Sequence, residues 1–238
     1  MHNIKALLFD YGGTLDTAAC HWSYVLEDGY RHVGIHLAED DFRTAYVFAE
    51  RALAKNPIIK PDFTFKRLLQ EKVRLELQSL SEQGVLTFAS DAEQENAIEG
   101  VATYCDNFAR SHVEQSSRTL ETLSKKYKLV MVSNFYGNLS TILRTYGIAH
   151  LFDAVVESAV VGVRKPSPDI WKLGVEAAQC DAPEAVAIGD SFSKDIIPAR
   201  SVGCQTVWFK GREWEEKEYD ETMPTHVISS LEELTRLF

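Results

Sequence analysis

The chain alternates between short, almost continuous apolar runs and longer segments in which apolar residues recur at helical spacing. The apolar runs cover residues 6–9, 129–132, 154–156, 185–188 and 206–209. Runs this short that are apolar at nearly every position are typical of parallel strands covered on both faces. We therefore predict that these segments form a parallel β-sheet.

Amphipathic helices are predicted between most of these strands. Apolar or small residues recur at three- and four-residue spacing, first at Leu139, Ile142, Leu143 and Tyr146 and then at Ile170, Leu173, Gly174 and Ala177. Strands that alternate with helices in this way predict a doubly wound α/β fold, with helices on both faces of a parallel sheet. The pattern Ser230-Leu231-Glu232-Glu233 is typical of a capping box and predicts a short helix near the end of the sequence.

The segment between the first and second predicted strands breaks this alternation. It has no convincing strand pattern, and its clearest helical stretches cover residues 42–53, 65–80 and 91–108. A helical segment of this length is too long for a simple connection between neighbouring strands. We therefore predict an α/β core domain from residues 1–16 and 110–238, and an inserted α-helical domain from residues 17–109.

Composition and charge limit the classes of partner. The chain has 238 residues, of which 45% are hydrophobic and 25% charged, as in ordinary globular proteins. Its formal net charge of -10 argues against nucleic-acid binding, although a local lysine or a metal ion can still attract a small phosphorylated substrate. The four cysteines form no C-x-x-C pair, and no apolar run approaches about 18 residues. Because no signal peptide is recognisable either, we expect a cytoplasmic protein without a membrane span.

Polar side chains follow several of the predicted strands. Asp10 ends the first strand and opens a glycine-rich turn, and Ser133 closes the second strand. Asp190 ends a later strand, and Asp195 lies in the turn or helix start that follows. Open α/β sheets bind ligands at the carboxyl ends of their strands, so we expect these groups at that edge. Acids that converge there suit Mg²⁺, which takes oxygen ligands and keeps several waters.

These motifs follow one another in a characteristic order. Asp10 comes first, then Ser133, then the segment Arg164-Lys165-Pro166, and last the spacing Gly-Asp-x-x-x-x-Asp at Asp190 and Asp195. In this order the chain resembles the haloacid dehalogenase-like (HAD) hydrolase superfamily. The resemblance covers the whole chain and implies a Rossmann-like core with an inserted helical cap of the C1 type.

The resemblance implies a catalytic role for three of these residues. Asp10 would be the nucleophile that attacks phosphorus and forms an aspartyl-phosphate. Ser133 would donate a hydrogen bond to the phosphoryl group, and Lys165 would offset its charge and orient the nucleophile. Asn134 would either bind substrate or shape the turn. The expected function is hydrolysis of a small phosphorylated metabolite.

The resemblance also implies a Mg²⁺ site. Asp10, the main-chain carbonyl of Gly12 and Asp190 would ligate the ion directly. Asp195 would act through water or through Lys165. The spacing of the two later acids favours the Mg²⁺-dependent phosphotransfer branch of the family over its metal-independent dehalogenases, which lack this arrangement.

One position departs from the family pattern. Phosphatases of the family have a second Asp two residues after the nucleophile, where it protonates the leaving oxygen and then activates water. This chain has Gly12 there. General acid–base help is typically worth about 10²–10⁴-fold, so the substitution is consequential. Asp16 lies beyond the turn, and His21 is either a replacement that enters from the cap or an ordinary cap histidine.

Gly12 keeps two other functions open. One is a phosphate-binding or regulatory protein that has lost turnover. The other is hydrolysis of a C–P or C–halogen bond, as in the phosphonatase-like and dehalogenase-like branches of the family. The phosphonatase reaction needs a cap lysine that forms a Schiff base, and the sequence singles out none of its candidates, which are Lys55, Lys60, Lys66 and Lys72. Neither the substrate nor the oligomeric state can be read from the sequence.

Overall fold

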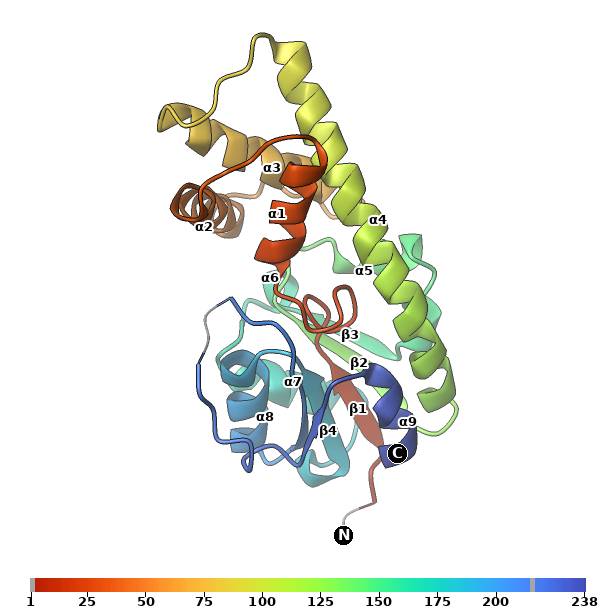
Figure 1. Ribbon diagram of the computed structural model, residues 1–238. Coiled ribbons are helices and arrows are strands. Elements are labelled where there is room, and N and C mark those ends of the chain that lie inside the picture. The colour runs from red at the N-terminus through yellow and green to blue at the C-terminus, as the bar shows by residue number, and fades with distance from the viewer. Residues whose placement is uncertain (1–2, 215–216) are drawn as a thin grey trace.

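A six-stranded parallel sheet forms one part of the molecule, and a group of helices forms the other (Figure 1). The computed structural model describes residues 3–214 and 217–238. Residues 1–2, which open the predicted core domain, therefore lie outside the described residues. Among the described residues, no helix is both long enough and apolar enough to cross a membrane.

The sheet has the strand order β3-β2-β1-β4-β5-β6, and all its neighbouring strands are parallel. The strands are β1 (Ala6–Phe9), β2 (Lys128–Ser133), β3 (Ala154–Glu157), β4 (Ala185–Gly189), β5 (Gln205–Phe209) and β6 (His226–Ile228). The strand order reverses direction between β1 and β4, which is the position where doubly wound sheets open a ligand crevice. Each predicted strand is present. The sequence pattern missed β6, a three-residue edge strand with two exposed residues, because it is too short and too polar for an apolar run.

Helices cover both faces of this sheet, which confirms the predicted doubly wound α/β fold. Leu7 and Phe9 of β1 pack in an apolar cluster with α5 (Leu139–Thr145) and α9 (Leu234–Leu237). Ala6 and Leu8 point to the opposite face and pack in a second cluster with Trp171 of α7 (Asp169–Ala178). Successive side chains of a strand point to opposite faces, so a strand buried on both faces must be apolar at every position.

Shorter elements complete the core. They are η1 (Ala149–Leu151), α6 (Ser158–Val161), η2 (Ala182–Glu184), the single π-helical turn η3 (Phe192–Ile196), α8 (Ile197–Val202) and η4 (Leu231–Glu233). The capping box at Ser230 and Glu233 is present, and it opens η4 and then α9, as the sequence predicted.

Four helices occupy the long segment between β1 and β2: α1 (Trp22–His32), α2 (Glu39–Lys55), α3 (Phe65–Glu82) and α4 (Asp91–Leu123). The three predicted helical stretches lie within α2, α3 and α4. Helix α4 continues well past residue 108, because no proline interrupts it and buried apolar residues recur at Val113, Leu120 and Leu123. The predicted boundary between residues 109 and 110 therefore falls inside α4, which runs from the other helices to the side of the sheet (Figure 1).

Candidate active site

The polar groups predicted from the sequence lie together at the carboxyl ends of β1, β2 and β4. Asp10 directly follows β1, and its backbone N–H donates to the carbonyl of Ile188 in β4 at 2.9 Å. Ser133 is the last residue of β2, and Asp190 directly follows β4. These three strands are neighbours in the sheet, so parallel pairing brings their carboxyl ends to one edge.

Three side chains lie within hydrogen-bond distance of the Asp10 carboxylate. Lys165 Nζ donates to Asp10 Oδ1 at 2.6 Å, and Ser133 Oγ donates to the same oxygen at 3.1 Å. Thr14 Oγ1 lies 3.2 Å from Asp10 Oδ2, so this second oxygen is the less engaged of the two. The carboxylate is therefore held in one orientation at the mouth of the sheet.

Lys165 joins two buried carboxylates. Its Nζ donates to Asp195 Oδ1 at 2.7 Å as well as to Asp10. Burial by itself lowers the pKa of Lys165, but the charges of Asp10 and Asp195 outweigh it and raise the pKa above its ordinary value. The ammonium is therefore fully charged at neutral pH and can offset the charge of an incoming phosphoryl group.

Three carboxylates gather beside this ammonium. One oxygen from each of Asp10, Asp190 and Asp195 lies within 4.8 Å of the other two. Burial, and then the charges of Asp10 and Asp195, raise the pKa of Asp190 well above its usual range. Burial also raises the pKa of Asp195 to about 6, against the opposing charge of Lys165. Crowding of this kind is costly without a cation that the carboxylates share.

The donor set fits a hard divalent cation. Asp10 and Asp190 offer carboxylate oxygens, and Gly12 lines the same cavity. Among residues 3–214 and 217–238, no group donates a hydrogen bond to the main-chain carbonyl of Gly12, so this oxygen is available as a ligand. Oxygen ligands alone, with room for water, are what Mg²⁺ prefers.

Two glycines make room for the acids. A Cβ at Gly189 would lie 2.4 Å from the side chain of Asp195, and one at Gly13 would lie 2.5 Å from Asp190 Oδ2. Gly13 also has a φ of +96°, in the left-handed region that favours glycine. At both positions an acid lies so close to the backbone that only glycine, which has no Cβ, fits.

Gly12 leaves the proton-transfer position open. A Cβ at this residue would meet no heavy atom within 4 Å, and the backbone is outside the left-handed region. Asp16 is no replacement, because it is buried and both its oxygens are engaged. The Gly13 N–H donates to Asp16 Oδ1 at 2.7 Å, and the Trp22 indole N–H donates to Oδ2 at 3.0 Å.

His21 lines the cavity, but its hydrogen bonds hold it neutral. The backbone N–H of Ser23 donates to His21 Nδ1, so this nitrogen is an acceptor and the neutral ring carries its proton on Nε2. Burial and the nearby charges of Lys194 and Lys72 lower the pKa of His21 to about 4. In this arrangement His21 offers a hydrogen-bond donor to a ligand and cannot accept a proton from water.

The site opens into a cavity of about 1090 Å³ that core and helical insertion both line. Of the four candidate lysines of the insertion, Lys55 and Lys72 are among the residues that line this cavity. Lys72 is buried, forms an ion pair with Glu50, and lies 4.1 Å from the ring centroid of Tyr46. The charge of Glu50 raises the pKa of Lys72 against the effect of burial, so this amine is protonated and not nucleophilic.

The structure assigns Asn134 a definite set of contacts. Its amide nitrogen donates to the Lys165 carbonyl at 3.0 Å, and its Oδ1 accepts the Lys165 N–H at 2.8 Å. Both polar ends of the side chain are thus used to fix the backbone of Lys165. Of the two interpretations that the sequence left open, the contacts favour the one in which Asn134 shapes the site.

Sequence reasoning missed other groups of the site. Thr14 Oγ1 lies 2.9 Å from Asp190 Oδ1 as well as 3.2 Å from Asp10 Oδ2, so it links two of the acids. Its position in the turn after Asp10 was the only available signal. Tyr136 Oη donates to Glu50 at 2.9 Å and so joins the core to the insertion across the cavity, a contact with no signature in the sequence.

Known proteins resemble this chain in sequence and in fold. It is 44% identical over 63 residues, 26% of each chain, to the glyceraldehyde 3-phosphate phosphatase of Pyrococcus abyssi. It is 30% identical over 163 residues, 66% of each chain, to the 5-amino-6-(5-phospho-D-ribitylamino)uracil phosphatase YigB of Escherichia coli. The chain thus spans about a quarter and about two thirds of the lengths of these two relatives.

Solved structures share the fold at lower identity. The magnesium-bound HAD-hydrolase YfnB of Bacillus subtilis superposes with a TM-score of 0.63 at 19% identity, over 99% of both chains. A dehalogenase superposes with a TM-score of 0.66 at 17% identity, over 100% of this chain and 98% of the other. A family model described as haloacid dehalogenase-like hydrolase matches residues 4–203, most of the chain. The chain therefore belongs to the haloacid dehalogenase-like hydrolases.

Proposed function

We propose that this protein is a Mg²⁺-dependent phosphohydrolase that acts on a small phosphorylated metabolite through an aspartyl-phosphate at Asp10. The observation that supports it most is the convergence of Asp10, Lys165 and Asp190 at one sheet edge. The phosphatases among its sequence relatives point to the same chemistry. The helical residues 17–109 are proposed as a cap domain over this edge, and a cytoplasmic location remains a prediction.

In the proposed reaction, Asp10 attacks phosphorus. A bond forms between its carboxylate oxygen and phosphorus while the bond from phosphorus to the ester oxygen breaks. The Lys165 ammonium offsets the charge that repels carboxylate and phosphate, and Ser133 donates to a phosphoryl oxygen. Bound Mg²⁺ supplies further charge neutralisation at the phosphoryl oxygens. Water then attacks phosphorus, the aspartyl-phosphate bond breaks, and inorganic phosphate leaves as Asp10 is regenerated.

The missing carboxyl group at Gly12 limits this reaction. The leaving alkoxide takes its proton from water, and the attacking water loses its proton without a positioned base. General acid–base catalysis contributes about 10²–10⁴-fold, so turnover is expected to be slow for ordinary phosphate esters. Aryl and acyl phosphates, whose leaving groups need little protonation, should be the better substrates.

Gly12 also favours a second candidate function, a phosphate-binding or regulatory protein with little turnover. Lys165, Ser133 and a cation held by the acid cluster would bind a phosphate without any acid–base group. The phosphonatase-like alternative gains no support from Lys72, the buried lysine of the cavity, which is charged and paired with Glu50. A metal-independent dehalogenase needs no cluster of Asp10, Asp190 and Asp195.

A phosphatase screen with Mg²⁺ over a panel of phosphorylated metabolites and aryl phosphates tests the proposal. The wild type should release phosphate, and the Asp10→Asn variant should not. Phosphate release by both proteins at the same rate would exclude Asp10 as the nucleophile. Absence of release, together with calorimetric binding of inorganic phosphate, would favour the binding protein instead.

A further inference from the structure

Helix α2 carries two basic residues, Arg51 and Lys55, that have no acidic partner among residues 3–214 and 217–238. Every Lys and Arg of α1 and α3 forms an ion pair, namely Arg31, Lys66, Arg67, Lys72 and Arg74. Among the described residues, Arg51 and Lys55 of α2 form neither an ion pair nor a side-chain hydrogen bond. They are four residues apart, where like charges on a helix repel each other. Both residues are exposed, so their charges are accessible to a ligand.

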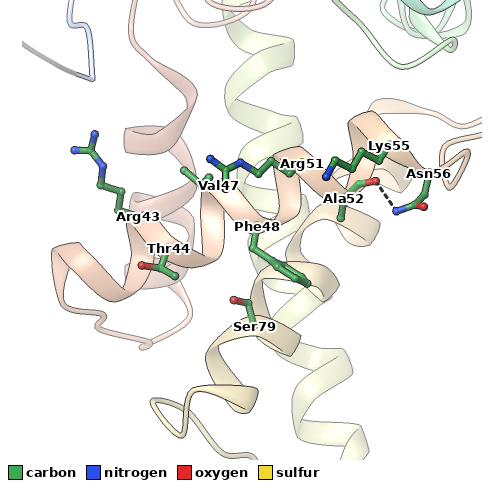
Figure 2. Close-up of a pocket in the computed structure, with 9 residues that line it drawn as sticks. All are labelled: Arg43, Thr44, Val47, Phe48, Arg51, Ala52, Lys55, Asn56 and Ser79. Carbon is green, nitrogen blue, oxygen red and sulfur yellow. Dashed lines mark hydrogen bonds between the residues drawn. The ribbon is translucent and has the colours of Figure 1, made fainter.

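These two cations border the catalytic cavity. Arg51 and Lys55 line it together with Asp10 and Lys165. They also border a second cavity, of about 750 Å³, on the face of α2 that meets Ser79 of α3. Figure 2 shows both side chains along one side of α2, with Ser79 on the other. Arg51 and Lys55 therefore line both cavities.

Arg164 and Lys194 are two of the core cations that line the catalytic cavity. Arg164 directly precedes Lys165, and Lys194 directly precedes Asp195. Neither side chain has an ion pair or a hydrogen bond within residues 3–214 and 217–238. The charge of Lys194 acts on both His21 and Glu50 of the insertion.

The described acids of the cavity form no ion pair with these four cations. Outside the cluster beside Lys165, its lining carboxylates are Glu50 and Glu213. Glu50 is engaged by Lys72 and Tyr136. Glu213 is half-buried and forms a hydrogen bond with Tyr219. The cavity lining thus offers cations besides Lys165 that no described carboxylate pairs with.

We infer that the substrate carries a second anionic group, a carboxylate or a second phosphate, which Arg51, Lys55, Arg164 and Lys194 bind while the transferred phosphoryl group lies at Asp10. The inference rests on the proposed function. The cavity volume of about 1090 Å³ holds much more than one phosphate. Cations that bind a second anion select substrates by ground-state affinity and leave the chemistry at Asp10 unaltered.

Two matched pairs of ligands test this inference. 3-Phosphoglycerate differs from glycerol 3-phosphate by a carboxylate, and fructose 1,6-bisphosphate differs from fructose 6-phosphate by a phosphate. Calorimetry on the Asp10→Asn protein with Mg²⁺ measures affinity without turnover, and wild-type kcat/KM measures hydrolysis. We expect a preference of at least about tenfold, the usual worth of one charge-assisted contact, for the doubly anionic member of at least one pair. The pair that shows it identifies the second group as carboxylate or phosphate.

Arg51→Gln should lower this preference about tenfold, through affinity or KM, because it removes one charge-assisted contact. Arg118→Gln is the matched control, since Arg118 is an exposed α4 arginine that also has no partner among the described residues and does not line the cavity. Lys55→Gln serves as a second variant should Arg51→Gln fold poorly. An equal loss in the Arg51 and Arg118 variants would indicate long-range attraction without a subsite and overturn the inference.

The outcomes for the two proposals can be separated. Hydrolysis of both members of each pair at equal kcat/KM and affinity would contradict the second anion site but uphold the phosphohydrolase. A preference in binding without any hydrolysis would support the anion site and count against the proposed function. Failure of every ligand to bind would overturn the anion site.

Discussion

Lys165 Nζ lies 2.6 Å from Asp10 Oδ1, and the two side chains are only 2% and 9% exposed. Charges so well shielded from water interact strongly, and each is costly to leave alone. The pair therefore fixes the orientation of the proposed nucleophile and makes the local fold depend on the ammonium.

Replacement of this ammonium should cost stability. Lys165→Met keeps most of the side-chain volume but leaves Asp10 and Asp195 without their shared cation, which should lower the free energy of unfolding by about 3 kcal/mol at neutral pH. Urea unfolding without Mg²⁺ measures it. Lys172→Met is the control, because its ion pair with Asp169 is exposed and should leave the unfolding midpoint unchanged. Equal midpoints in the two variants would contradict the importance of the buried pair.

Restoring a carboxyl group at Gly12 should accelerate hydrolysis. The position has open space and an ordinary backbone conformation, so Gly12→Asp should fold normally. If proton transfer limits turnover, hydrolysis of phosphate monoesters should rise by at least about tenfold. Gly12→Asn, which has the same shape but cannot transfer a proton, is the matched control. A folded Gly12→Asp protein that is no faster than Gly12→Asn would show that something else limits this enzyme.

The close approach of Asp195 to Gly189 predicts a metal-binding defect. A Cβ at residue 189 would lie 2.4 Å from the Asp195 side chain and displace it from Lys165. Groups that orient metal ligands are typically worth 10–100-fold in metal affinity, so Gly189→Ala should bind Mg²⁺ about tenfold more weakly in calorimetry. Gly12→Ala, where the Cβ meets open space, should retain the affinity. Asp190→Ala should lose most of it, and unchanged binding in that variant would exclude the site.

A buried glutamate in the insertion predicts how stability depends on pH. Glu76 accepts a hydrogen bond from Tyr30 Oη at 2.8 Å, while its Oε1 has no partner, and burial raises its pKa to about 7 from 4.5. Because the folded state holds the proton more tightly, this group destabilises the fold progressively as pH rises from 4.5 through 7.

Glu76→Gln should remove this penalty while keeping an oxygen for Tyr30. The variant should be more stable than the wild type by roughly 1–3 kcal/mol at pH 8, with the difference vanishing near pH 4.5. Urea unfolding at several pH values measures it, and the difference between the two proteins cancels other titrating groups such as His21. A difference that does not change with pH would show that Glu76 is ionised to the same extent in both states.

The local pattern of apolar residues in the sequence determined the strands of this protein. Parallel strands buried on both faces need apolar residues at every position, so the strands from β1 to β5 were readable from short runs of sequence. The order of Asp10, Ser133, Lys165 and Asp190 also indicated the family and the edge of the sheet where these groups would lie. Both inferences depend on neighbours in sequence or on the order of motifs, and neither needs distances.

Only the tertiary structure decided what those groups contact. Asn134 could have faced substrate, but the fold brings it to the backbone of Lys165, 31 residues away. Tyr136 meets Glu50 from 86 residues away, and the lack of a partner for Arg51 within the described part of the chain is visible only once the acids of that part are placed. Side-chain contacts between distant segments depend on how strands and helices pack, and sequence spacing carries no information about that packing. The sequence therefore determined the chemistry that Asp10 can perform, whereas packing decided which groups hold it and which charges surround it.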